Sequence, residues 1–157
     1  MDAFVLNICS QLFKVTTDLH RKTQTGMDAK RLFLTLLPER FGICRFDPNA
    51  SVPNWALTSP FYSVTRTPEE VSIVCHEGLI PEETPYEKGW RCIKLQGPID
   101  FSEIGILSSL VQPLARADIS IFALSTYDTD YLFVREGDLS KTIEMLGEEG
   151  FVVRQHF

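Results

Sequence analysis

Two short polar segments of the sequence carry residue types that could bind a small charged molecule. The first, residues 100–110, runs from acidic and hydroxyl side chains through Gly105 into apolar residues at helical spacing. A helix that begins there leaves backbone N–H groups unpaired in a partial positive field, and Gly105 would let a carboxylate come close. Alternatively, Gly105 could serve only to let this helix pack tightly on a sheet.

The second polar segment, residues 125–130, places hydroxyl groups and two carboxylates at the tip of an expected hairpin. Asp128 and Asp130 are two positions apart, so their side chains point the same way if the chain is extended. Together the two segments could hold a zwitterion, with N–H donors for its α-carboxylate and acids for an amine or a guanidinium. An ordinary polar turn would explain the second segment equally well.

Sequence motifs of the common enzyme classes are absent. The glycines match neither the phosphate-binding loop nor the dinucleotide-binding pattern, and no Gly-x-Ser-x-Gly sequence occurs. Cys75 and His76 are adjacent, so in a strand they would point to opposite faces and could not act as nucleophile and base. Catalysis by Asp128 and Asp130 alone stays formally open, but no second acid–base partner is found. We therefore expect no catalytic residue, and a small hydrolase or transferase is the weakest of the alternatives.

Charge and cysteine spacing narrow the class of protein further. The 157 residues include 15 Lys+Arg and 21 Asp+Glu, and the net charge of −6 gives nucleic acid no attractive field. Four cysteines without the spacing of a zinc or redox motif, together with three histidines, predict neither a metal nor a cofactor. No apolar run approaches the ~20 residues of a membrane helix. We expect reduced thiols in a cytoplasmic protein.

The second half of the chain has the clearest hydrophobic rhythm. Strands are predicted at residues 90–96, 119–126, 130–135 and 151–154, and helices at residues 104–117 and from Asp138, the expected N-cap, to Gly147 or Gly150. This order of strand, helix, strand, strand, helix and strand is that of the ferredoxin-like fold. We therefore predict an α+β protein whose antiparallel sheet carries both helices on one face.

The first half supplies a similar series of strands, with a loop where the second half has its first helix. The pattern predicts strands at residues 31–37, 41–46, 61–66 and 71–75, a break at Pro38, a single turn at 67–70, and loops at 47–54 and 76–88. It favours a degenerate first module at residues 27–88 and a second module at 89–157. Residues 1–26 are interpreted as a helical or disordered extension, and Met27 as a possible alternative start.

The polar segments also lie in a longer stretch that resembles tandem ACT-domain proteins related to the CASTOR arginine sensors. The runs that carry the resemblance are Gly-Trp-Arg-Cys at 89–92, Gly-Pro at 97–98, Phe-Ser-Glu-Ile-Gly-Ile at 101–106, and residues 119–131, which include Ser-Thr-Tyr-Asp-Thr-Asp. Residues 61–70 and 72–75 extend it into the first half, so that it covers about residues 31–153.

The resemblance implies two ACT modules and a ligand, usually an amino acid, between the loop after the first strand of a module and the sheet edge of a neighbouring module. Carried over by position, one wall of the ligand site would consist of Ser102, Glu103, Ile104, Gly105, Ile106 and Leu107. The other wall would consist of Ser125, Thr126, Tyr127, Asp128 and Asp130, with an acid facing the cationic end of the ligand.

In functional terms the resemblance implies a regulatory or sensor protein that binds a small molecule and has no catalytic activity. The CASTOR sensors carry four modules, and a homodimer of this chain would restore that number. The alternative is a structural or dimerisation module with an empty pocket. No segment for engaging a signalling complex is recognisable, and the ligand's identity is beyond the sequence.

Overall fold

The computed structural model describes residues 33–155, and the extension predicted at residues 1–26 lies outside them. Seven strands form one sheet in the order β2-β3-β1-β4-β6-β5, and β7 pairs with the beginning of β1. The strands are β1 Phe33–Phe46, β2 Tyr62–Arg66, β3 Val71–His76, β4 Tyr86–Leu95, β5 Ile121–Ser125, β6 Asp130–Arg135 and β7 Val152–Gln155. All neighbours are antiparallel except β1 and β7, which run parallel.

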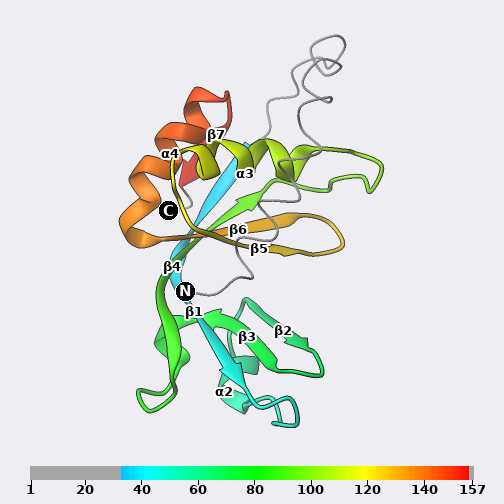
Figure 1. Ribbon diagram of the computed structural model, residues 1–157, viewed down its shortest axis with the longest axis vertical. Coiled ribbons are helices and arrows are strands. Elements are labelled where there is room, and N and C mark those ends of the chain that lie inside the picture. The colour runs from blue at the N-terminus through cyan, green and yellow to red at the C-terminus, as the bar shows by residue number, and fades with distance from the viewer. Residues whose placement is uncertain (1–32, 156–157) are drawn as a thin grey trace.

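Three α-helices and two short 3₁₀ turns connect these strands. They are α2 Asn54–Leu57, η1 Glu77–Leu79, α3 Ile106–Arg116, η2 Glu136–Asp138 and α4 Leu139–Glu148. Figure 1 shows α3 and α4 together at one end of the molecule, β2, β3 and α2 at the other end, and β1 and β4 running between the two ends. The two long central strands therefore belong to both halves of the sheet.

The predicted break at Pro38 is wrong, because β1 continues through it. The pairing of β1 with β4 shifts register between Leu36 and Arg40, so the proline lies in a bulge where its missing N–H breaks no ladder bond. Arg91 on β4 donates a hydrogen bond from its guanidinium to the carbonyl of Leu37, at 3.3 Å. The bulge thus keeps β1 continuous.

β4 also begins earlier than the sequence pattern indicates. Tyr86 and Glu87, predicted as part of a loop, already pair with β1, and Gly89 has a φ of +71° where the register shifts. This second irregularity hides the alternation of apolar and polar residues on which the prediction depended. The predicted module boundary between residues 88 and 89 falls inside β4.

The elements of the second half match their predictions more closely. The strand at 130–135 has the predicted bounds, and the helices differ from their predicted ends by a residue or two. Asp138 does precede α4, but its side chain makes no capping hydrogen bond. Its backbone carbonyl instead accepts a hydrogen bond from the Thr142 hydroxyl, at 2.8 Å.

Alternation along β4 divides the core into two faces of the sheet. On the helix-covered face, α3 and α4 pack on the strands in one cluster, which contains Leu34, Leu36, Ile93, Leu95, Ile106, Leu110, Leu114, Ile119, Leu132, Val134 and Leu146. On the opposite face, Trp90 and Cys92 pack with Phe41, Val74 and Phe133. A third cluster lies around α2 and β3. Each buried aliphatic or aromatic side chain contributes about 1.5–3 kcal/mol of transfer free energy.

The three cysteines of the described chain are free thiols in these clusters. Burial raises the pKa of Cys44 to about 11 and that of Cys75 to about 12, and it raises the pKa of Cys92 as well. We expect alkylation by iodoacetamide at about pH 8 to spare all three in the native protein, because the thiolate is the reactive form. Peptide mass mapping should find them modified only after unfolding in guanidinium, and native modification at the rate of a free thiol would contradict this burial.

Candidate functional site

The loop between β4 and α3 (residues 96–105) lies against the β5–β6 hairpin turn (residues 126–129). The amide of Ile99 donates a hydrogen bond to the carbonyl of Asp128 at 2.9 Å. The rings of Phe101 and Tyr127 meet edge to face, with centroids 5.2 Å apart. The two segments predicted as walls of one site are therefore neighbours in the structure, although about 20 residues separate them.

Gly97 makes this close approach possible, and the sequence analysis did not assign it that role. A Cβ on Gly97 would clash with the backbone oxygen of Asp128 and would lie 3.1 Å from the Cβ of Thr129. The Thr129 hydroxyl is buried and donates to the carbonyl of Leu95 at the end of β4. The only sequence signal was the position of Gly97 directly after a predicted strand.

Gly105 occupies the N-cap position of α3, where the chain turns from loop to helix. Its φ is +88°, in the left-handed region that glycine adopts readily, and a Cβ there would meet no atom within 4 Å. Tight packing is therefore not the reason for a glycine at this position. The first helical hydrogen bond runs from the Ser109 amide to the Gly105 carbonyl at 2.9 Å, so within the described chain the amides of Ile106 and Leu107 have no acceptor.

The rest of the loop wall is mostly exposed. Ser102 donates from its amide and hydroxyl to the Asp100 carboxylate, at 2.8 and 2.6 Å, and these bonds, the hydroxyl one first, lower the pKa of Asp100. Glu103 and Ile104 are exposed, Ile104 at 87%. The Ile106 side chain belongs to the core on the helix-covered face and Leu107 is half-buried, so these two residues offer backbone rather than side-chain groups.

In the β5–β6 hairpin the two predicted acids, Asp130 and Asp128, do not lie on the same side. Asp130 accepts a hydrogen bond from the Ser125 hydroxyl at 2.6 Å, and along β6 it shares the helix-covered face with Leu132. Asp128 lies in the turn, where the chain is not extended, and lines a groove with Lys94 of the opposite face. The turn itself is closed by a hydrogen bond from the Thr126 amide to the Thr129 carbonyl at 2.8 Å, and Tyr127 is 81% exposed.

The groove beside Asp128 has a volume of about 660 Å³. It is lined by Thr35, Leu37, Lys94, Gln96, Gly97, Pro98, Asp128 and Thr129. Most of these residues come from β1, β4 and the first residues of the loop, and Asp128 is the one predicted site residue among them. Lys94 could have been noticed as a charge on the strand face that otherwise carries Trp90 and Cys92.

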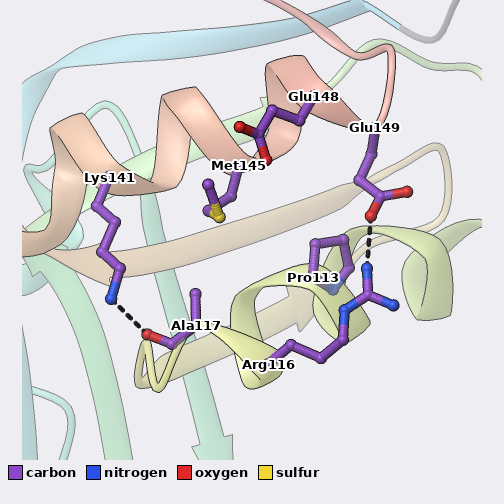
Figure 2. A pocket seen from close by; sticks show the side chains of 7 residues that line it. All are labelled: Pro113, Arg116, Ala117, Lys141, Met145, Glu148 and Glu149. Atoms are coloured by element: carbon purple, nitrogen blue, oxygen red, sulfur yellow. Dashed lines mark hydrogen bonds and ion pairs between the residues drawn. The ribbon is translucent and has the colours of Figure 1, made fainter.

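A second cavity, of about 350 Å³, lies between α3 and α4, away from both predicted walls (Figure 2). Its two basic side chains already have partners. Lys141 donates to the carbonyl of Ala117 at 2.6 Å, and Arg116 pairs with Glu149 (Figure 2). Met145 and Pro113 supply apolar lining. These contacts join the two helices, and no predicted site residue reaches this cavity.

Residues 33–155 contain neither a helix suited to a membrane span nor a metal-binding cluster of side chains. No helix in this range is long and apolar enough to cross a membrane. Within the same range no three His, Cys, Asp or Glu side chains converge as ligands of a metal ion would.

Comparison with known proteins adds two family models and several relatives. The ACT domain model matches residues 86–148, and a model of an N-terminal domain matches residues 39–83. The Cytosolic arginine sensor for mTORC1 subunit 1 of Bos taurus is 32% identical in an alignment of 106 positions that covers 60% of this chain and 32% of that protein. The match thus spans about a third of the sensor's length. The human Putative protein CASTOR3P is 35% identical over 57% of this chain and 63% of its own length.

Two solved structures place the fold. The protein Atu0741 from Agrobacterium tumefaciens is 40% identical, with a TM-score of 0.77 over 82% of this chain and 96% of that chain. The regulatory subunit of aspartate kinase from Thermus thermophilus is similar in fold alone, with 8% identity and a TM-score of 0.55 over 74% of this chain and 96% of that one. Residues 86–148 therefore match the ACT domain, and the chain is similar in sequence to the CASTOR arginine sensors over 60% of its length.

Proposed function

We propose that this protein binds a free amino acid and acts as a regulatory or sensor module without catalytic activity. The observation that carries the proposal is the start of α3, where Gly105 opens the approach and the amides of Ile106 and Leu107 have no acceptor within the described chain. The α-carboxylate of an amino acid is the ligand group that suits such a helix start. The relatives named as arginine sensors support the same class of ligand.

Asp130 is the group that we propose for the cationic end of the ligand. Its carboxylate is half-buried beside Ser125, and the loop bearing the α3 start is bound to this hairpin through Ile99. A charge-assisted hydrogen bond from a guanidinium or ammonium group would satisfy the oxygen that Ser125 leaves free. Arginine is the first candidate because the relatives that match this chain are named for it.

We also propose that the chain consists of two ACT modules that share β4. The series β1-α2-β2-β3-η1-β4 and β4-α3-β5-β6-α4-β7 have the same order of strands and helices, with α2 and η1 much the shorter. The sheet orders β2-β3-β1 and β5-β6-β4 correspond for the first three strands of each series, whereas the fourth strand of the second series, β7, pairs with β1 and not with β4. This supports a reduced first module. We further propose a cytoplasmic homodimer, for which the buried free thiols and the exposed sheet edges are consistent observations.

A structural or dimerisation module with an empty pocket is the second candidate. It is favoured by the exposed apolar side chains on the loop before α3 and on the hairpin turn. Phe101 is 78% exposed, and Ile104 and Tyr127 are exposed even more. Apolar side chains that cluster on a surface often mark an interface between proteins. This candidate requires assembly but no ligand.

The proposed ligand position can be tested by calorimetry with L-arginine and the other amino acids. We expect Gly105→Val to abolish binding at the start of α3, because a branched side chain would fill the open approach and strain a positive φ. If the ligand is basic, Asp130→Asn should weaken binding about ten- to a hundredfold by removing a charge-assisted hydrogen bond.

Gly137→Val is the matched control, since Gly137 also has open space around it but no positive φ. Circular dichroism verifies the fold of each variant, and light scattering on the same samples gives the mass of the assembly. Equal amino-acid affinities of the Gly105→Val and Gly137→Val variants would show that the ligand does not bind at the start of α3. A dimer that binds none of the twenty amino acids would favour the structural module instead.

A further inference from the structure

Lys94 is a cation on the opposite face of the sheet, away from α3 and α4. Its direct neighbours across the ladders are Thr35 on β1 and Tyr131 on β6. Its side chain is half-buried, and its ammonium nitrogen lies 5.8 Å from the centroid of the Tyr131 ring. Within residues 33–155 it forms no ion pair. No described carboxylate therefore holds the Lys94 ammonium group, which leaves it available to an anion from outside the chain.

Asp128 provides the opposite charge in the same groove. Its carboxylate makes no hydrogen bond or ion pair with any described residue, in contrast to Asp130, which Ser125 holds. The side chains of Thr35 and Gln96 line the groove as well, and they too lack hydrogen-bond partners in the described part of the chain. Leu37 and Pro98 supply apolar walls. Four polar side chains without a described hydrogen-bond partner therefore line one groove, Thr35 and Lys94 half-buried and Gln96 and Asp128 exposed.

We propose that this groove is a second ligand position, which binds the zwitterionic end of a free amino acid. Lys94 takes the α-carboxylate, and Asp128 takes the α-ammonium group. The groove volume of about 660 Å³ is in the range of small-molecule sites and leaves room for a side chain over Leu37 and Pro98. Asp128 disfavours a phosphate or a dicarboxylate, because a second negative charge would face its carboxylate.

This position differs from the one proposed at the start of α3. It lies on the opposite face of the sheet and uses no N–H group of a helix. The two positions share the hairpin turn, because the backbone of Asp128 holds the loop through Ile99 while its side chain lines the groove. The groove therefore stands on its own residues and does not depend on the proposal for α3.

The test is an NMR titration of the full chain with L-arginine, recorded on backbone amides. We expect the amide resonances of Gln96 and Gly97 to shift on titration, and the affinity obtained from these shifts to fall at least tenfold in Lys94→Met. The shifts at Ile106 and Leu107 should persist in that variant. Lys88→Met is the matched control, because Lys88 also lies over a tyrosine ring, that of Tyr86, at 5.4 Å but outside the groove. Agmatine, which lacks the carboxylate, should shift Gln96 and Gly97 far less than arginine does.

The outcomes separate the two positions. If the shifts at Gln96 and Gly97 are equal in Lys94→Met and Lys88→Met, the groove is not a ligand position. Shifts confined to Ile106 and Leu107 would show the same and leave the position at α3 intact. Shifts confined to the groove would support it and remove the position at α3. No shift at any of these amides with any of the twenty amino acids would overturn both.

Discussion

Replacing Phe41 with alanine should lower the free energy of unfolding by about 3–5 kcal/mol, the usual cost of emptying a fully buried aromatic site. Phe41 is 0% exposed and lies in β1 where the two ends of the sheet meet. Its ring contacts Phe61, His76 and Phe133 edge to face, with centroids 5.4, 5.1 and 5.5 Å away. The cavity would open between segments from three parts of the chain.

Denaturant unfolding measures this change directly. Phe101→Ala is the matched control, because the same truncation at a 78% exposed position should change stability by no more than about 0.5 kcal/mol. A similar small loss in both variants would mean that Phe41 does not join the two ends of the sheet.

Gly97→Val should both destabilise the protein, by about 1–3 kcal/mol, and abolish amino-acid binding at the two proposed positions. The new side chain would meet the backbone oxygen of Asp128, which cannot rotate away as the end of a side chain can. Either the loop or the hairpin must then move, and the bond from Ile99 to Asp128 is broken. Thermal unfolding and the arginine titration report the two effects separately.

Gly147→Ala is the control for this substitution. Gly147 lies inside α4, and an added methyl group there would meet no atom within 4 Å, so alanine should stabilise the protein by about 0.5–1 kcal/mol. A Gly97→Val variant that binds arginine with unchanged affinity would show that the contact between loop and hairpin is not needed for binding.

Local patterns predicted much of the second half of the chain. The strand at 130–135 follows a clear turn and has a continuous apolar run at residues 131–134, and its bounds agree with the structure. The spacing of Leu107, Leu110, Val111 and Leu114 likewise indicated α3, which begins at Ile106. Periodicity suffices for α3, which buries one face against the sheet, whereas β6 is buried on both faces and was indicated by its apolar run and the turn before it.

The bounds of the central strands β1 and β4 could not be predicted from local patterns, for a physical reason. A proline normally ends a strand, but in β1 it falls in a bulge whose existence depends on the distant partner β4. The parallel pairing of β7 with β1 is another contact between remote segments. No local pattern could indicate that β1 would lie between β7 and β4.

The candidate site shows the same division between local and remote information. The positive φ of Gly105 was foreseeable from its place between loop and helix. Asp128 and Asp130 were expected to point the same way only if the chain between them is extended, and the structure places Asp128 in the turn that was expected at the hairpin tip. Lys94 and Gly97 gained their roles only when β1 and the hairpin came beside them.

The sharing of β4 between the two ends of the sheet also limits how this chain can change in length. Loops tolerate insertions, but β4 has Ile93 and Leu95 under the helices and Trp90 and Cys92 in the core of the opposite face. Deleting one residue from this run, for example Arg91, would exchange the faces for every position on one side of the deletion. In two separate domains the linker absorbs such a change. Here the connection between the halves is itself a core strand, so an insertion or deletion in one half carries its register error into the other.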